Sequence, residues 1–137
     1  MPDTAKGGCL CGAVRYSFPK QAVTSAGHCH CTDCQKATGS GKATIVFVAA
    51  DELELEGELR FYTVTGTDGS HVSRGFCPAC GSPIISQVAE QPEVRFIKAG
   101  SLDDPRWVVP ELSFWSDSAH DWSPVDADLP SFPGNPE

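Results

Sequence analysis

Apolar and polar residues alternate in short runs along this chain, and glycine or proline residues separate the runs. Alternation over about four to eight residues is typical of half-buried strands. The most apolar run, ATIVFVA at residues 43–49, predicts one such strand. The same pattern predicts further strands at residues 13–18, 53–56, 59–65, 71–76, 82–88, 94–99 and 111–116.

Turn residues indicate how these runs are connected. Gly57-Glu58 separates the runs at 53–56 and 59–65 and predicts a hairpin between them, and residues 66–70 predict a turn. We expect residues 1–8 to be a loose lead-in to the first strand.

One short helix is expected between residues 33 and 39. Thr32 and Gln35 match the T-x-x-Q capping box that marks a helix start, and Gly39 is of the type that commonly ends a helix. Cys34 would then lie in the first turn, where unpaired N–H groups and the helix dipole favour a thiolate. Short strands, frequent turns and one helix together indicate a mainly β fold.

Chain length and proline content suggest a single domain over residues 1–137. Thirteen glycines and eleven prolines predict frequent turns. Four of the prolines fall in residues 124–137. We therefore expect a core over about residues 7–123, followed by an irregular tail that packs at most Leu129 and Phe132 onto it.

Charge and termini argue against several classes of protein. The net charge of −8 disfavours a nucleic-acid or anionic-membrane partner, because phosphate binding needs a basic surface. The start Met1-Pro2-Asp3 carries no signal peptide, and no apolar run approaches the ~20 residues that span a bilayer. Seven cysteines without an export signal indicate metal rather than disulfides, and a reducing compartment with the cytoplasm as the default.

The seven cysteines divide as four plus three. A C-x-C pair and a distant C-x-x-C pair can together supply a closed tetrahedral zinc site, namely Cys9, Cys11, Cys77 and Cys80. Pro78 presets a turn inside the second pair, and Gly81 after it tolerates the positive φ that a zinc knuckle needs. Such a site would stabilise the fold by joining distant segments, whereas the alternative for each pair is plain burial in the core.

The remaining three thiols form C-x-C-x-x-C and can provide an open site. Three thiolates leave one of the four positions around zinc free, which distinguishes catalytic from structural zinc. Alternate residues of a straight strand lie too far apart to share an ion, so the chain should bend where Cys29, Cys31 and Cys34 meet. The alternative is a structural zinc whose fourth ligand is His28 or His30.

With these motifs the chain resembles the glutathione-dependent formaldehyde-activating enzyme family, which also contains centromere protein V. The similarity covers roughly residues 7–130 and rests on Gly8-Cys9-Leu10-Cys11-Gly12, Cys29 with His30-Cys31-Thr32-Asp33-Cys34-Gln35, Arg74-Gly75-Phe76-Cys77-Pro78-Ala79-Cys80-Gly81, and Trp122 to Leu129-Pro130. The resemblance implies small antiparallel sheets organised around the structural four-cysteine zinc, and a second zinc at the other three cysteines. It also implies addition of glutathione to formaldehyde to give S-hydroxymethylglutathione, the reverse of a carbon–sulfur lyase reaction.

The chemistry of a three-thiolate zinc agrees with such a reaction. It suits a soft ligand better than water, so a substrate thiol could bind there, lose its proton and attack an aldehyde held nearby. His28 and His30 could relay the proton, or they could only orient the loop. Lys36, Lys42 and Arg74 could contact the carboxylates of the thiol substrate, or they could be solvated surface charges.

Two functional classes follow from the sequence. The first is a carbon–sulfur lyase-type enzyme that uses two zinc ions and acts on glutathione or a related thiol and on formaldehyde or another small aldehyde. The second is a zinc-stabilised binding module without catalysis. One departure from the family bears on this choice: many members have a histidine shortly after a proline in the last strand, where this chain has Pro110-Glu111-Leu112-Ser113.

Overall fold

The computed structural model describes residues 3–66 and 68–136 of the chain. Within these residues the chain forms two β-sheets, one α-helix and four short 3-10 helices. The helix α1 spans Thr32–Thr38, and the 3-10 helices are η1 (Lys20–Ala22), η2 (Ala50–Glu52), η3 (Ala99–Ser101) and η4 (Ser116–Ser118). The strands are β1 (Thr4–Gly8), β2 (Arg15–Pro19), β3 (Val23–Cys29), β4 (Ala43–Ala49), β5 (Glu54–Glu56), β6 (Arg60–Thr65), β7 (His71–Phe76), β8 (Pro83–Val88), β9 (Val94–Lys98), β10 (Leu112–Phe114) and β11 (Ser131–Phe132).

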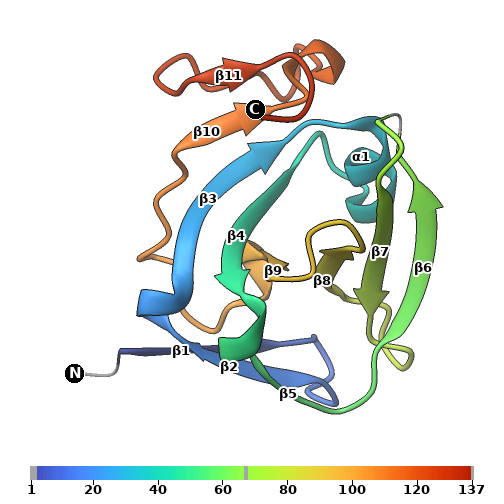
Figure 1. Ribbon diagram of the computed structural model, residues 1–137, viewed down its shortest axis with the longest axis vertical. Coiled ribbons are helices and arrows are strands. Elements are labelled where there is room, and N and C mark those ends of the chain that lie inside the picture. The colour runs from blue at the N-terminus through green and yellow to red at the C-terminus, as the bar shows by residue number, and fades with distance from the viewer. Residues whose placement is uncertain (1–2, 67, 137) are drawn as a thin grey trace.

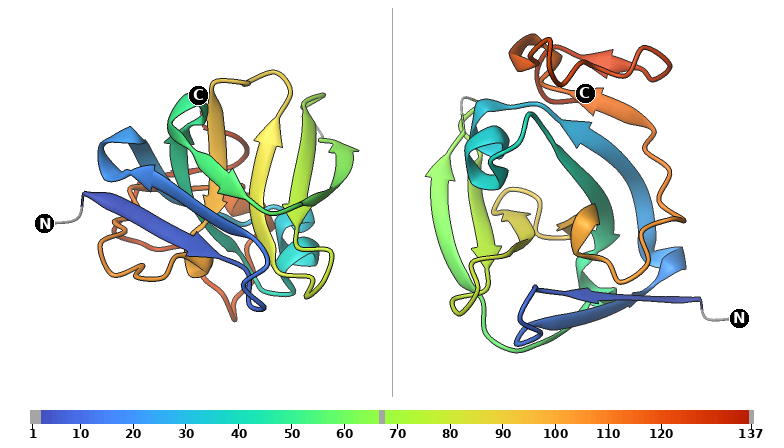
Figure 2. Two further views of the ribbon diagram at one scale, coloured as in Figure 1. Left: turned by 90° about the horizontal axis from the view of Figure 1, so that it is seen from below. Right: turned by 180° about the vertical axis from the view of Figure 1, so that it is seen from behind.

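The large sheet has the strand order β11-β10-β3-β4-β9-β8-β7-β6 and curves strongly, and the small sheet β1-β2-β5 lies across one end of it (Figure 1). The strand pairs are antiparallel except at β10, which runs parallel to both β3 and β11. Helix α1 lies towards the end of the large sheet away from the small sheet, as the views in Figure 2 also show. The mainly β fold with antiparallel sheets and one short helix, predicted from the sequence, is confirmed.

Strand β4 packs into a different buried cluster on each face, which explains why both of its faces are apolar. Val46 and Val48 belong to a buried cluster that joins the large sheet to the small one. Ile45 and Phe47 point the other way, into a second cluster that contains Cys29 and Cys34 and packs against β10. Side chains alternate between the faces of a strand, so a strand between two cores must be apolar at every position.

The structure corrects the expectations for the first residues and for one hairpin. Residues 4–8 are not a loose lead-in, because β1 pairs along its whole length with β2. No hairpin joins β5 to β6: β5 pairs with β2 in the small sheet, whereas β6 pairs with β7 in the large sheet. Gly57, with φ of 92°, lies against the backbone of Ala13 where the chain crosses from one sheet to the other.

The C-terminal tail is more ordered than expected. Phe132 packs on the second cluster as predicted, but it does so from β11, which extends the large sheet.

At the turn predicted over residues 66–70, the N–H of Gly66 donates to the carbonyl of Ser70 at 2.7 Å, and Thr67 lies outside the described residues.

Candidate functional site

The four cysteines of the first predicted metal site lie together. Cys9 and Cys11 follow β1, Cys77 and Cys80 follow β7, and their four Sγ atoms lie within 4.8 Å of one another. Cys11 Sγ is 3.6 Å from Cys9 Sγ and 3.8 Å from Cys77 Sγ. A tetrahedral zinc with Zn–S bonds of about 2.3 Å requires sulfur atoms about 3.8 Å apart. This cluster therefore has the spacing that a closed zinc site needs.

The turns around these cysteines have the geometry expected of a zinc knuckle. Gly81 adopts the predicted positive φ, at 81°, and its N–H donates to the carbonyl of Cys77 at 2.8 Å. Backbone N–H groups also point at the sulfurs: that of Val14 donates to Cys9 Sγ at 3.2 Å, and that of Ala79 to Cys77 Sγ at 3.4 Å. Such donors stabilise a thiolate.

The other three cysteines lie at the junction between β3 and α1. Cys29 is the last residue of β3, Cys31 is the N-cap of α1, and Cys34 lies in the first turn. Their Sγ atoms lie within 4.8 Å of one another, so the chain bends there as the sequence required. We call Cys29, Cys31 and Cys34 the three-cysteine cluster. Like the first cluster, it could hold a metal ion.

The helix begins differently from the capping-box prediction. The N-cap is Cys31, whose Sγ accepts a hydrogen bond from the N–H of Cys34 at 3.2 Å. Gln35 does not reach back to Thr32; its Nε2 donates instead to the carbonyls of His30 and Ser118, at 2.8 and 3.0 Å. Gln35 therefore fixes the loop before the helix against the C-terminal part of the chain.

A cavity of about 730 Å³ opens beside the three-cysteine cluster, and all three of its cysteines line it. One wall is aromatic: the ring of Phe47 meets those of Phe96 and Phe114 edge to face, with centroids 5.2 and 6.2 Å away. An apolar wall with a few polar groups on the other sides is the usual composition of a small-molecule site.

Two basic side chains line this cavity beside the sulfurs. Arg74 Nη2 lies 3.8 Å from Cys34 Sγ. Lys98, at the end of β9, is only 8% exposed, and its Nζ donates to Ser86 Oγ at 2.9 Å. Both cations favour negative charge on the cysteines.

Within the three-cysteine cluster, the pKa of Cys34 is lowered and that of Cys29 is raised. Hydrogen bonds from the thiols of Cys29 and Cys31 lower the pKa of Cys34, and the charges of Lys98 and Arg74 lower it further. Hydrogen bonds to Cys31 and Cys34 raise the pKa of Cys29, and burial raises it further. The positive charges of Lys98 and Arg74 therefore favour a thiolate at Cys34.

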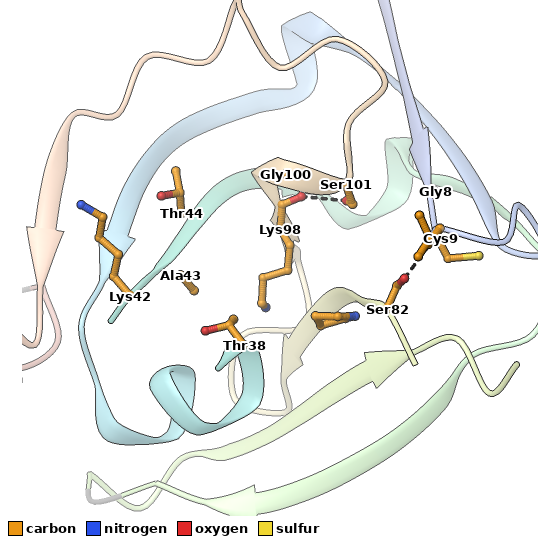
Figure 3. A pocket seen from close by; sticks show the side chains of 12 residues that line it. Gly8, Cys9, Thr38, Lys42, Ala43, Thr44, Ser82, Lys98, Gly100 and Ser101 are labelled. Carbon is orange, nitrogen blue, oxygen red and sulfur yellow. Dashed lines mark hydrogen bonds between the residues drawn. The ribbon is translucent and has the colours of Figure 1, made fainter. Parts of the chain in front are cut away.

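The other two predicted contact residues do not line the cavity of the three-cysteine cluster. Lys42 lines a second cavity, of about 510 Å³, and Lys36 is exposed on α1 and lines neither cavity. The second cavity lies between the segment around Cys9 and the C-terminal end of α1, and Lys98 lines it too (Figure 3).

The two histidines next to the three-cysteine cluster in the sequence, His28 and His30, do not face its cavity. His28 Nδ1 is 2.9 Å from Thr44 Oγ1, and His30 is fully buried, with neither ring nitrogen hydrogen-bonded among the described residues. Neither histidine lines the cavity of the three-cysteine cluster. Their role as a proton relay stays a prediction.

Sequence reasoning missed Lys98, Ser86 and Asn135. Asn135 lines the cavity, and its side chain bonds to Trp115 Nε1 and to Asp68 on the β6–β7 turn. Lys98 had one available signal, because a lysine follows directly after the apolar pair Phe96-Ile97 at the end of β9. Ser86 lies in the predicted strand over residues 82–88 and Asn135 in the proline-rich tail, where neither residue belongs to a motif.

Fold and site together define a mainly β protein with two cysteine clusters that could each hold zinc, one of them facing a cavity. The chain belongs to the glutathione-dependent formaldehyde-activating enzyme family, whose sequence model matches residues 4–118.

The chain is also similar to a solved structure. The crystal structure of a Rhodobacter sphaeroides protein is 27% identical in sequence and superposes with a TM-score of 0.58, over 77% of this chain and 97% of that one. No curated protein matches the chain. In the described residues, no helix is long and apolar enough to cross a membrane.

Proposed function

We propose that this protein is a zinc-dependent carbon–sulfur lyase-type enzyme that joins glutathione, or a related thiol, to formaldehyde or another small aldehyde. The observation that carries the proposal is the position of the three-cysteine cluster, which lines a cavity large enough for a small substrate. The cluster of Cys9, Cys11, Cys77 and Cys80 is complete with four sulfurs and serves as the structural site. Each chain would thus carry two zinc ions.

The chain's own residues provide most of what the reaction needs. A zinc ion held by Cys29, Cys31 and Cys34 would supply a Lewis acid that binds the substrate sulfur and lowers its thiol pKa. Negative charge would then accumulate on four sulfurs, and the side chains of Arg74 and Lys98 are placed to balance it. The cavity holds thiol and aldehyde side by side and excludes water from the apolar wall.

Contacts to the rest of the thiol substrate follow from its charge. Glutathione carries two carboxylates, and Arg74 is the predicted cationic partner that lines the cavity beside the cluster. Lys36 and Lys42 would serve only a part of the substrate that extends beyond this cavity. His28 and His30 remain candidates for proton relay through the loop that they flank.

Two measurements test this function. Metal analysis should find two zinc ions per chain, and titration with glutathione should perturb only the ion at the three-cysteine cluster, which Co²⁺ substitution would show as a change in its absorption bands. Magnetisation-exchange NMR should show faster exchange between free formaldehyde and the glutathione adduct with the protein than without it. Equal exchange rates would overturn the enzymatic assignment, and an unperturbed second metal would favour a zinc-stabilised binding module instead.

The proposal extends to surroundings and partners. All seven cysteines are unpaired, which suits the reducing cytoplasm. Small thiols and aldehydes are the proposed partners, and the net charge of −8 disfavours nucleic acid and anionic membranes as partners.

A further inference from the structure

Lys98 occupies an unusual position for a lysine. It is 8% exposed, and none of the ion pairs in the described residues involves it. Lysine is almost never fully buried unless it is paired with an acidic group. Its Nζ has one hydrogen-bond partner among the described residues, Ser86 Oγ at 2.9 Å, although an ammonium group has three N–H donors.

The backbone holds Lys98 in a fixed place. The residue pairs with Ile45 of β4, and its carbonyl accepts a hydrogen bond from Ser101 Oγ at 2.7 Å. From there the side chain extends towards α1 and the end of the helix at Thr38 (Figure 3). Among the described residues, the Nζ is thus anchored by one hydroxyl, and it borders the cavity of the three-cysteine cluster.

The groups around the amine favour a role beyond packing. Its ionisable neighbours are Arg74 from β7 and the cysteines Cys29, Cys31 and Cys34 from the junction of β3 and α1. Burial lowers the pKa of Lys98, and the negative charge of Cys34 opposes this effect. A buried cation without a carboxylate partner is costly. A group that binds there and accepts its free N–H bonds would recover part of that cost.

We propose that Lys98 is a further catalytic residue, whose amine binds the oxygen of the substrate aldehyde and protonates it as the thiol adds. This inference rests on the proposed function. The atoms that it uses are the Nζ of Lys98 and the carbonyl oxygen, in the cavity that Lys98 lines together with the three-cysteine cluster.

The proposed step balances without any further reactant. The substrate thiolate forms a bond from sulfur to the carbonyl carbon, and the π electrons of the carbonyl move to its oxygen. That oxygen takes a proton from the Lys98 ammonium and becomes the hydroxyl of a hemithioacetal. The neutral amine then takes up the proton that the next substrate thiol loses on binding. Ser86 Oγ holds the amine in place throughout the cycle.

Substitutions at Lys98 separate this role from a purely electrostatic one. Lys98→Met keeps the length of the side chain without its amine, and it should lower the exchange rate by about 10²-fold or more while the fold is retained. Lys98→Arg keeps the charge and the donors, but a guanidinium does not give up a proton in this pH range. Lys98→Arg should therefore bind glutathione like the parent and still react slowly.

A matched control and a second readout complete the test. Lys6→Met removes an exposed lysine on β1 and should leave the rate unchanged. Reductive methylation of the protein with formaldehyde and cyanoborohydride, mapped by mass spectrometry, should modify Lys98 at least as fast as Lys6 despite its burial. This second readout does not depend on catalysis.

The outcomes distinguish the two proposals. A parent protein without activity would overturn the proposed function, whereas an active parent with equally active Lys98→Met would overturn only the role of Lys98. Parent-level rates for Lys98→Arg would reduce Lys98 to a source of charge and overturn the proton transfer. A Lys98 that stays unmethylated after the exposed lysines have reacted would show that the aldehyde does not reach it, and this too would overturn the inference.

Discussion

Arg74 Nη2 lies 3.8 Å from Cys34 Sγ, a contact that joins β7 to the first turn of α1. The two residues belong to motifs that the sequence analysis treated separately. Cys34 is a member of the three-cysteine cluster, whereas Arg74 stands three residues before Cys77 of the other cluster. The strand that presents Arg74 therefore leads directly into the four-cysteine cluster, so this cluster also positions a residue of the cavity.

Arg74 is expected to matter for binding of the thiol. Arg74→Met should weaken glutathione binding by about tenfold or more, because hydrogen bonds to charged groups contribute roughly 1.5–3 kcal/mol. Isothermal titration calorimetry measures the affinity. Arg106→Met is the matched control, since Arg106 is exposed and pairs with Asp104 outside the cavity. Equal losses in both variants would show that overall charge, and not the site, attracts the substrate.

The two cysteine clusters should respond differently to loss of one sulfur. Cys77→Ser is expected to unfold the protein or to destabilise it by at least several kcal/mol, because zinc at that cluster joins segments far apart in the sequence. Cys34→Ser should keep the fold and one zinc ion but lose thiol binding. Circular dichroism melting with zinc analysis by mass spectrometry compares them. A Cys77→Ser protein that melts like the parent would contradict the structural role.

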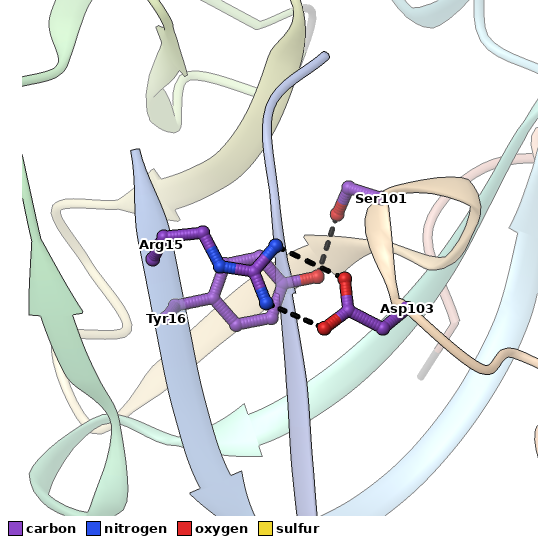
Figure 4. A network of polar contacts seen from close by, with 4 residues as sticks. All are labelled: Arg15, Tyr16, Ser101 and Asp103. Carbon is purple, nitrogen blue, oxygen red and sulfur yellow. Dashed lines mark hydrogen bonds and ion pairs between the residues drawn. The ribbon is translucent and has the colours of Figure 1, made fainter. Parts of the chain in front are cut away.

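Because Tyr16 is buried, the protein should lose stability at alkaline pH. Its hydroxyl lies 2.6 Å from Ser101 Oγ, beside the Arg15–Asp103 ion pair (Figure 4), and burial raises its pKa to about 12. The unfolded chain releases this proton near pH 10 and the folded chain does not, so the unfolded state binds fewer protons in between. The free energy of unfolding should therefore fall as pH rises from 10 to about 12, by roughly 2–3 kcal/mol from this residue.

Tyr16→Phe isolates that contribution. Chemical denaturation of parent and variant at several alkaline pH values should show a smaller loss in the variant, because the ionisation of other groups affects both proteins alike. Parallel curves would mean that Tyr16 is not the group responsible.

Asn135 is expected to shape the opening of the cavity. Its side chain links Trp115 to Asp68, so Asn135→Ala removes a connection between the tail and the β6–β7 turn. Glutathione affinity should fall a few-fold while the melting temperature changes little, since both bonds are exposed. Asn135→Asp tests the same contact in a second way, because the new carboxylate and that of Asp68 would repel each other. This variant should bind glutathione more weakly than Asn135→Ala.

Cysteine spacing predicted which thiols lie together, because each motif contains its own turn and the four-plus-three division leaves no sulfur over. The strands over residues 43–49 and 71–76 were predicted with the correct bounds, because each is a short run that begins just after a turn rich in glycine and serine. The helix was also predicted, although its N-cap was not. Thr32 has a typical capping side chain, but the N-cap is Cys31, one residue earlier. The Sγ of Cys31 accepts the hydrogen bond from the N–H of Cys34.

Other features depend on contacts that the sequence does not reveal. Gly57-Glu58 has the composition of a hairpin turn, but a local turn signal cannot show that the chain is changing sheets there. The pairing of β5 with β2 and the close approach of Gly57 to Ala13 distinguish the two cases. Lys98 ends a strand, where a lysine normally reaches solvent, but it is buried and donates to Ser86 of the neighbouring strand β8.

The last described residues of the chain, Asn135 and Pro136, line the cavity of the three-cysteine cluster, while β1 lies in the small sheet across the other end of the fold (Figure 1). An affinity tag fused after residue 137 would therefore begin close to the substrate opening, and one fused before Met1 would not. A truncation that removes Asn135 and Pro136 would likewise remove part of the cavity lining. Preparations that differ only in their C-terminal ends should thus differ in apparent activity, and N-terminal tagging is the appropriate choice for assays.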